Sequence, residues 1–138
     1  FNVPQKSMTI NLVTVLVAAA VNFFIGFMFH GPIGGKMWMK LANIVPTGKE
    51  KFSDMVPQMV KSYFMNVVAA YVLGVLIVGT GVMGVYEGMM LAFMVWLGFI
   101  VTSSSMDVIW MKGNVKLWLY ESGVALLSFL AMGAILAN

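Results

Sequence analysis

His30, Asp107 and Glu121 are the side chains of this sequence best suited to moving a proton. Each lies at or near the same end of a long apolar stretch, so we expect all three to approach one face of a membrane. An imidazole and two carboxylates within reach of one another can relay protons. We prefer a structural interpretation, in which Glu121 pairs with Lys112 or Lys116 and reaches water from the membrane interface, and keep the relay as the alternative. Because an unpaired carboxylate inside a membrane is costly, Glu121 is the first residue to test.

Asn22 and Asn66 are the polar residues deepest in the apolar stretches. Both lie around a third of the way in from the same membrane face. We expect them to hydrogen-bond across the first pair of helices and to hold these helices in register, with a polar substrate site as the alternative. The polar run 102–105 either lines a notch or bonds the carbonyls of its own helix.

Little else in the sequence suits catalysis. It contains one histidine and no cysteine, and charged residues make up 9% of the chain. This composition excludes thiol chemistry and leaves thin material for acid–base catalysis. Met37 and Met39 flank Trp38 close to His30, and thioether sulfur suits Cu(I), but methionine is more often a flexible apolar filler. We therefore expect no enzyme activity, no catalytic residue, no cofactor and no bound metal.

Four long apolar stretches position these residues. Hydrophobic residues make up 61% of the chain, whereas a soluble domain carries about 25% charged residues. Each stretch is long enough to cross a ~30 Å hydrocarbon core as a helix. The chain therefore predicts an all-α, integral membrane four-helix bundle in a single transmembrane domain, residues 1–138. Ser53 and Asp54 predict the N-terminal cap of the second span. The expected spans are residues 8–30, 55–79, 85–107 and 116–137.

A short amphipathic segment follows the first span. Residues 33–44 set apolar side chains against Lys36 and Lys40, which is typical of a helix lying in the headgroup layer. Tryptophan and lysine favour the membrane interface, so we interpret several such residues as interfacial anchors. The anchors are Lys36, Trp38, Lys40, Trp110 and Lys112.

The distribution of lysine predicts the orientation. Of the eight lysines, only Lys6 lies outside the first and third connecting segments and their edges. Positively charged loops stay in the cytoplasm, so we expect both of these segments inside and both termini outside. The expected location is the cytoplasmic (inner) membrane, crossed several times.

Two parts of the sequence match at a constant offset. Gly26 and Trp38 recur, with similar neighbours, as Gly98 and Trp110, an offset of 72 residues in both cases (98 − 26 and 110 − 38). A duplication would make the bundle two parallel-repeat helical hairpins, related by an axis along the membrane normal, as in some transporters. Convergence is the alternative, because any cytoplasmic interface favours tryptophan and lysine.

The same residues carry a resemblance to a known family. Its pattern has a glycine in the first span, a proline, a Gly-Lys-x-Trp-Met box, a Trp-Leu-Gly-Phe box and a glycine-rich last span. The matching positions here are Gly26, Pro32, residues 35–39, residues 96–99, and Gly123 with Gly133. From residue 8 onward the chain resembles domain of unknown function 1761, a family of small four-span bacterial membrane proteins. The pair before the proline, His30-Gly31, departs from the aromatic and small polar residues that the pattern leads us to expect. The resemblance implies an architecture and no activity.

Two functions fit these features. Gly84 with Gly88, and Gly133 with Ala137, are small residues four apart that predict close helix contacts within or between subunits. We therefore expect a non-enzymatic protein of helix packing and assembly, acting as a homo-oligomer or as an accessory subunit of a larger membrane complex. The alternative is a small transporter or channel for a small solute or ion, working as an oligomer. The expected partners are the lipid bilayer and itself or other membrane subunits, without nucleic acid.

Overall fold

The computed structural model describes residues 10–138, and within them every regular element is a helix. Four helices are long and apolar enough to cross a membrane. The all-α fold class and the four spans are thus confirmed. A shorter helix, α2 (Gly35–Ala42), follows the first long helix. The long helices are α1 (Leu12–His30), α3 (Phe52–Thr80), a composite third helix over Val85–Trp110, and α6 (Val115–Leu136).

The start of α3 differs from the sequence-based expectation. The helix begins at Phe52, and Lys51 takes the cap position without a side-chain hydrogen bond. Asp54 therefore lies in the first turn, where its backbone N–H bonds the Lys51 carbonyl at 3.0 Å. The cap predicted at Ser53 and Asp54 was wrong because the chain turns helical before it reaches them. One consequence is that the Asp54 carboxylate is available for contacts outside its own helix. Residues 8 and 9 of the predicted first span lie outside the described residues.

The composite third helix changes pitch in its middle. It consists of α4 (Val85–Val95), a π-helical segment η1 (Trp96–Val101) and α5 (Thr102–Trp110). Such wide turns leave carbonyls poorly bonded, and hydroxyl side chains can satisfy them. Here the Thr102 hydroxyl donates to the Gly98 carbonyl at 2.6 Å, and the Ser104 hydroxyl donates to the Ile100 carbonyl at 2.6 Å. The polar run 102–105 thus bonds its own helix, as one of the two interpretations proposed.

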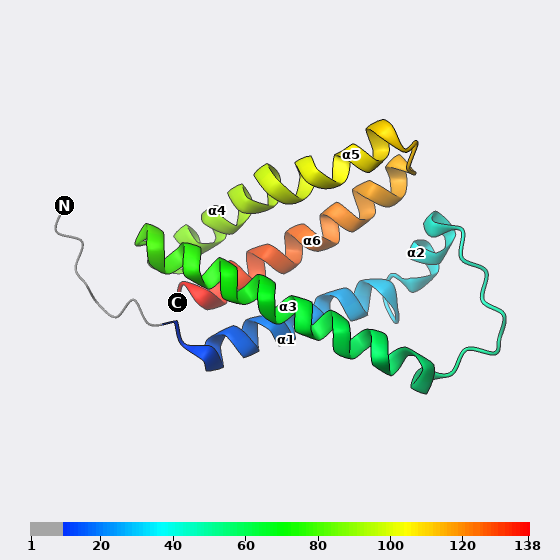
Figure 1. Ribbon diagram of the computed structural model, residues 1–138, viewed down its shortest axis with the longest axis horizontal. Helices are drawn as coiled ribbons and strands as arrows, with labels where there is room; N and C mark the ends of the chain where they lie inside the picture. The colour runs from blue at the N-terminus through cyan, green and yellow to red at the C-terminus, as the bar shows by residue number, and fades with distance from the viewer. Residues whose placement is uncertain (1–9) are drawn as a thin grey trace.

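The four long helices form two hairpins that join along α1 and α6 (Figure 1). α3 packs on α1, and α4 packs on α6. α3 also touches α6, but no Cα atom of α3 comes within 8 Å of α5. The two outer helices therefore diverge toward the end of the molecule that carries α2, as Figure 1 shows. We call this end the lysine-rich end. Its lysines are Lys36, Lys40, Lys49, Lys51, Lys61, Lys112 and Lys116.

The buried core lies in the other half of the molecule. It is built from small and medium side chains on all four long helices. Because small residues let helix backbones approach closely, this half packs tightly. The buried hydrophobic cluster is Val15, Ala18, Ala19, Ala70, Leu73, Ile77, Ala92 and Met132.

Glycines bring α4 and α6 into backbone contact in this core. A Cβ on Gly88 would fall on the carbonyl oxygen of Gly133, and a Cβ on Gly133 would fall on that of Gly88. The N–H of Gly84 also donates to the Ala137 carbonyl at 2.9 Å. The close contact predicted from these small residues is therefore present, and it lies within one chain.

The two copies of the sequence repeat fold differently beyond their glycines. In the first, the chain breaks after His30, and α2 returns Trp38 to a position against the His30 ring. In the second, the helix continues without a break to Trp110, which is 79% exposed. The proline at position 32 has no counterpart in the second copy, and it explains the break because a proline cannot continue a helix ladder.

Candidate functional site

Residues at four-residue spacing form one face of α1 and one face of α3; all four on α3 are polar, and two of the three on α1 are. On α3 they are Asp54, Gln58, Ser62 and Asn66. On α1, Asn22, Gly26 and His30 have the same spacing. Residues four apart lie one above the other on a helix, so each set forms a stripe along one face. The two stripes face each other across the antiparallel hairpin, since both line the same cavity.

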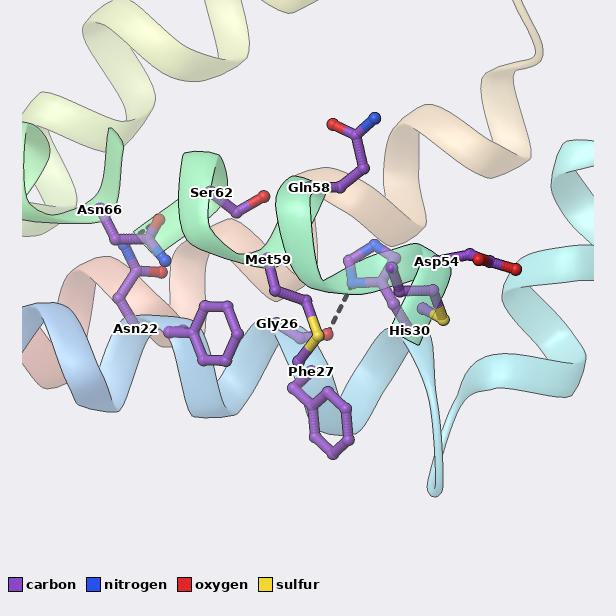
Figure 2. A pocket seen from close by; sticks show the side chains of 11 residues that line it. Asn22, Gly26, Phe27, His30, Asp54, Gln58, Met59, Ser62 and Asn66 are labelled. Carbon is purple, nitrogen blue, oxygen red and sulfur yellow. Dashed lines mark hydrogen bonds between the residues drawn. The ribbon is translucent and has the colours of Figure 1, made fainter. Parts of the chain in front are cut away.

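We call this cavity the polar groove. It has a volume of about 440 Å³ and lies between α1 and α3 at the lysine-rich end. A volume of this size can hold a small organic molecule. Figure 2 shows Asn22 and Asn66 at one end of the groove and His30 and Asp54 at the other. The lining residues are Asn22, Phe23, Gly26, Phe27, His30, Asp54, Met55, Gln58, Met59, Ser62 and Asn66.

The inner end of the groove is closed by two amides. The Asn22 Nδ2 donates to the Asn66 Oδ1 at 3.2 Å, which is the hydrogen bond expected from the sequence. A carboxamide carries two donor hydrogens and an acceptor oxygen, so this bond leaves the Asn22 oxygen and the Asn66 amide hydrogens able to bond a guest. Asp54, Gln58 and Ser62 are exposed along the groove and can bond water or a solute.

Beyond the amides the hairpin is apolar, including a second cavity lined by Leu12, Val15, Leu16, Val67, Val68 and Tyr71. The next residues toward the far end belong to the buried cluster, including Ala18 and Ala19 on α1 and Ala70 on α3. Each of these three has no exposed surface. The polar lining therefore runs from the lysine-rich end to the two asparagines and stops where these buried residues begin. Asn22 and His30 are eight residues apart, so this lining spans about 12 Å of helix.

His30 forms the outer part of the α1 wall and bonds through both ring nitrogens. Its Nδ1 lies 2.7 Å from the Gly26 carbonyl oxygen, one turn back on the same helix. Its Nε2 lies 2.9 Å from each carboxylate oxygen of Glu121 on α6. The side chains of His30 and Glu121 are 29% and 42% exposed, so both are within reach of water. This contact is the one ion pair found among residues 10–138.

Aromatic groups fix the position of the His30 ring. The Trp38 ring meets it edge-on, with centroids 5.0 Å apart. The Tyr120 ring is also edge-on to it, at 6.3 Å. The Tyr120 hydroxyl donates to the carbonyl of Phe29, in the last turn of α1. The end of α1, the start of α6 and the helix α2 are thus held as one cluster around His30.

The structure brings together some of the predicted residues and separates others. His30 and Glu121 are paired, and Asn22 and Asn66 are bonded, as two of the interpretations proposed. Neither Lys112 nor Lys116 pairs with Glu121 within the described part of the chain. Asp107 lies near the end of α5, which does not contact α1. The proposed three-residue relay is therefore reduced to a pair.

Three groove residues were missed by the sequence analysis. Asp54, Gln58 and Ser62 precede Asn66 at intervals of four, in a helix that is otherwise largely apolar. This spacing predicts a polar stripe along one face of the helix. We had treated Asp54 as a helix cap and Asn66 as an isolated amide, so the stripe went unrecognised.

Comparison with known proteins supports the family and little more. The family model described as "Protein of unknown function (DUF1761)" matches residues 13–137. The chain belongs to this family. No curated protein and no solved structure matches it. The polar groove is therefore interpreted from its own geometry.

Proposed function

We propose that this protein is a non-enzymatic membrane transporter that takes a small polar solute or ion into the polar groove and works as an oligomer. The observation that carries the proposal is the pair of facing stripes at four-residue spacing, which extend from the lysine-rich end to Asn22 and Asn66. Of the two functions expected from the sequence, this geometry favours the second.

The energetics of membrane helices support this choice. Polar side chains inside a hydrocarbon core are expensive, and they mark water-filled paths when they line a cavity. Asp54 and Gln58 precede Lys61 and lie at the membrane interface, but Ser62 lies further in, where a helix that only packs needs no polar residue. Two bonded asparagines would suffice to fix the register of the hairpin. This additional polar residue is therefore best explained by a hydrated path.

Transport requires that the groove open to both sides of the membrane in turn. In this structure the polar lining stops where the apolar cluster begins, so the structure corresponds to a state open at the lysine-rich end. Secondary transporters alternate between such states by moving helices around a central site. We expect the lysine-rich end of α3 to move, because no Cα atom of α3 lies within 8 Å of α5, whereas α1 packs along α6.

Thiol labelling tests the proposal, because the chain contains no cysteine. Ser62→Cys should react with a membrane-impermeant, water-soluble thiol reagent added to either side of sealed vesicles. Reaction from the lysine-rich side alone would mean a dead-end groove and would overturn transport. No reaction from either side would remove the hydrated groove itself.

Two matched variants set the background for this experiment. Val60 and Phe64 lie two residues to either side of Ser62 on α3 and are 65% and 66% exposed on its apolar surface. They bracket the depth of Ser62, about 3 Å on each side. Val60→Cys and Phe64→Cys should react from neither side, because lipid covers them. Equal labelling of all three positions would contradict a groove.

Assembly remains a second candidate function, supported by a separate observation. Apart from its own helix backbone and chain neighbours, a Cβ on Gly98 or Gly123 would have no atom of residues 10–138 within 4 Å. Glycine in a helix costs about 0.5–1 kcal/mol relative to alanine, and the usual gain is a close helix contact. Since the described part of the chain makes no such contact at either position, a second copy or another subunit is the partner that would use them.

A further inference from the structure

Hydrogen-bond geometry fixes the number of protons at the His30–Glu121 contact. The Gly26 carbonyl is an acceptor, so the Nδ1 that faces it at 2.7 Å must carry a hydrogen. The Nε2 faces both carboxylate oxygens of Glu121 at 2.9 Å. That contact is attractive only if one proton lies between them, either on Nε2 or on the carboxyl group. Without it, the Nε2 lone pair would face the lone pairs of a carboxylate.

We propose that the His30–Glu121 pair is a proton-binding site that couples protonation to the polar groove. The inference rests on the proposed function, because it assigns the coupling ion of the same groove. When the proton is bound, the pair holds the end of α1 to α6. When the proton leaves to water, the neutral ring and the carboxylate repel each other and the contact opens. No other reactant is needed, since the step is the binding or release of one proton.

The position of the pair explains how the groove would respond. His30 belongs to the wall of the groove and also bonds Gly26, a second residue of that wall. Opening the pair therefore releases the His30 ring, where the groove meets water, while the Tyr120 hydroxyl still bonds the Phe29 carbonyl. We expect the groove to become more accessible when the proton is lost. A solute bound in the groove and the proton are then linked, because each acts on the position of the His30 ring.

Few other ionisable groups face this site. Asp54 on α3 lines the opposite wall of the groove. Tyr120 on α6 lies beside the His30 ring, but its hydroxyl donates to the Phe29 carbonyl instead. α2 presents the uncharged Trp38. Glu121 is thus the group that decides the proton count at His30.

The test measures the rate at which Ser62→Cys reacts with the thiol reagent as a function of pH. The rate is measured once with the native His30–Glu121 pair and once with the added substitution Glu121→Gln. Each rate is divided by the rate of Lys49→Cys, a thiol in the exposed loop, at the same pH. This division corrects for the ionisation of the thiol, which makes any cysteine react faster as the pH rises. The corrected rate should rise severalfold between about pH 5 and about pH 8 with the native pair. In Glu121→Gln it should be flat, because the amide can donate to a neutral Nε2 and accept from a protonated one, so the contact persists across the pH range.

His30→Gln provides a second variant in case Glu121→Gln fails to fold. Its amide nitrogen takes the place of Nε2 and can bond the Glu121 carboxylate at every pH in the range, so the corrected rate should again be flat. A pH response that survives both substitutions would overturn the proton site and leave the groove intact. Absence of Ser62→Cys labelling at every pH would instead mean that the groove itself is wrong.

Discussion

The hydrogen bond between Asn22 and Asn66 is the residue-scale feature that can be weighed most directly. Interhelical hydrogen bonds in membranes average about 0.6 kcal/mol in double-mutant cycles. We expect Asn22→Leu and Asn66→Leu each to destabilise the protein, and the double variant to cost about 0.6 kcal/mol less than their sum. The free energy of unfolding in detergent, followed by circular dichroism, measures this coupling.

A cycle between distant residues is the control for this coupling. Thr80 lies at the end of α3 and donates to the carbonyl of Leu76 in its own helix. Thr80→Val combined with Asn22→Leu should give additive losses, since separated sites rarely interact. Additive losses for Asn22 and Asn66 as well would show that the bond contributes nothing to holding the hairpin.

The sequence identified the important polar residues more reliably than it predicted which of them pair with each other. Asn22 and Asn66 were paired correctly, because adjacent helices of a hairpin must meet and both amides lie at similar depth. Glu121 and His30 were both selected, but their pairing across 91 positions depends on α1 lying beside α6. No loop length fixes that order of helices. It is a property of tertiary packing, so from the sequence the lysine pairing was preferred and the proton relay stayed the alternative.

At the scale of the helices, glycine has two different roles in this chain. Gly88 meets Gly133 backbone to backbone, so a methyl group there would force α4 from α6. We expect Gly88→Ala to lower the free energy of unfolding by about 1–3 kcal/mol. The methyl group of Gly123→Ala meets no other helix or side chain among residues 10–138, so this variant should raise the free energy of unfolding by about 0.5–1 kcal/mol in the monomer. Unfolding in detergent measures both changes.

The oligomeric state of the same variants decides the second candidate function. Native mass spectrometry of gently extracted protein should show the same assembly for Gly88→Ala as for the native chain, if that variant folds. Gly123→Ala should weaken the assembly if Gly123 is a contact between chains. Unchanged assembly and higher stability together would assign the Gly123 face to lipid.

The elements themselves were predictable to different degrees. Span positions followed from length and hydropathy, because a membrane imposes both on any helix that crosses it. The π-helical segment at 96–101 did not, since its wide turn depends on how the helix packs and on hydroxyls that bond its carbonyls. The facing of the two polar stripes was equally inaccessible. Their spacing is visible in the sequence, but the rotation of each helix about its axis is set by neighbours.

The whole molecule divides into a closed half and an open half. The closed half holds the small buried residues and the contact between Gly88 and Gly133. The open half holds the polar groove, the His30–Glu121 pair and the divergence of α3 from α5 (Figure 1). Tight packing at one end and hydration at the other would let α3 pivot about the closed half. The side of the membrane that the open half faces then decides which compartment fills the groove.

Orientation is therefore the last prediction, and it follows from the lysine-rich end. Lysine-rich segments are retained in the cytoplasm, so the groove should open there. Lys49→Cys, in the loop before α3, should react with an impermeant thiol reagent only after the cells are permeabilised. Val82→Cys, in the turn between α3 and α4, should react in intact cells. The reverse pattern would turn the groove outward, where the His30–Glu121 pair would sense the external pH and a solute would enter from outside. Because both variants lie in loops, either result can be read without disturbing the helices.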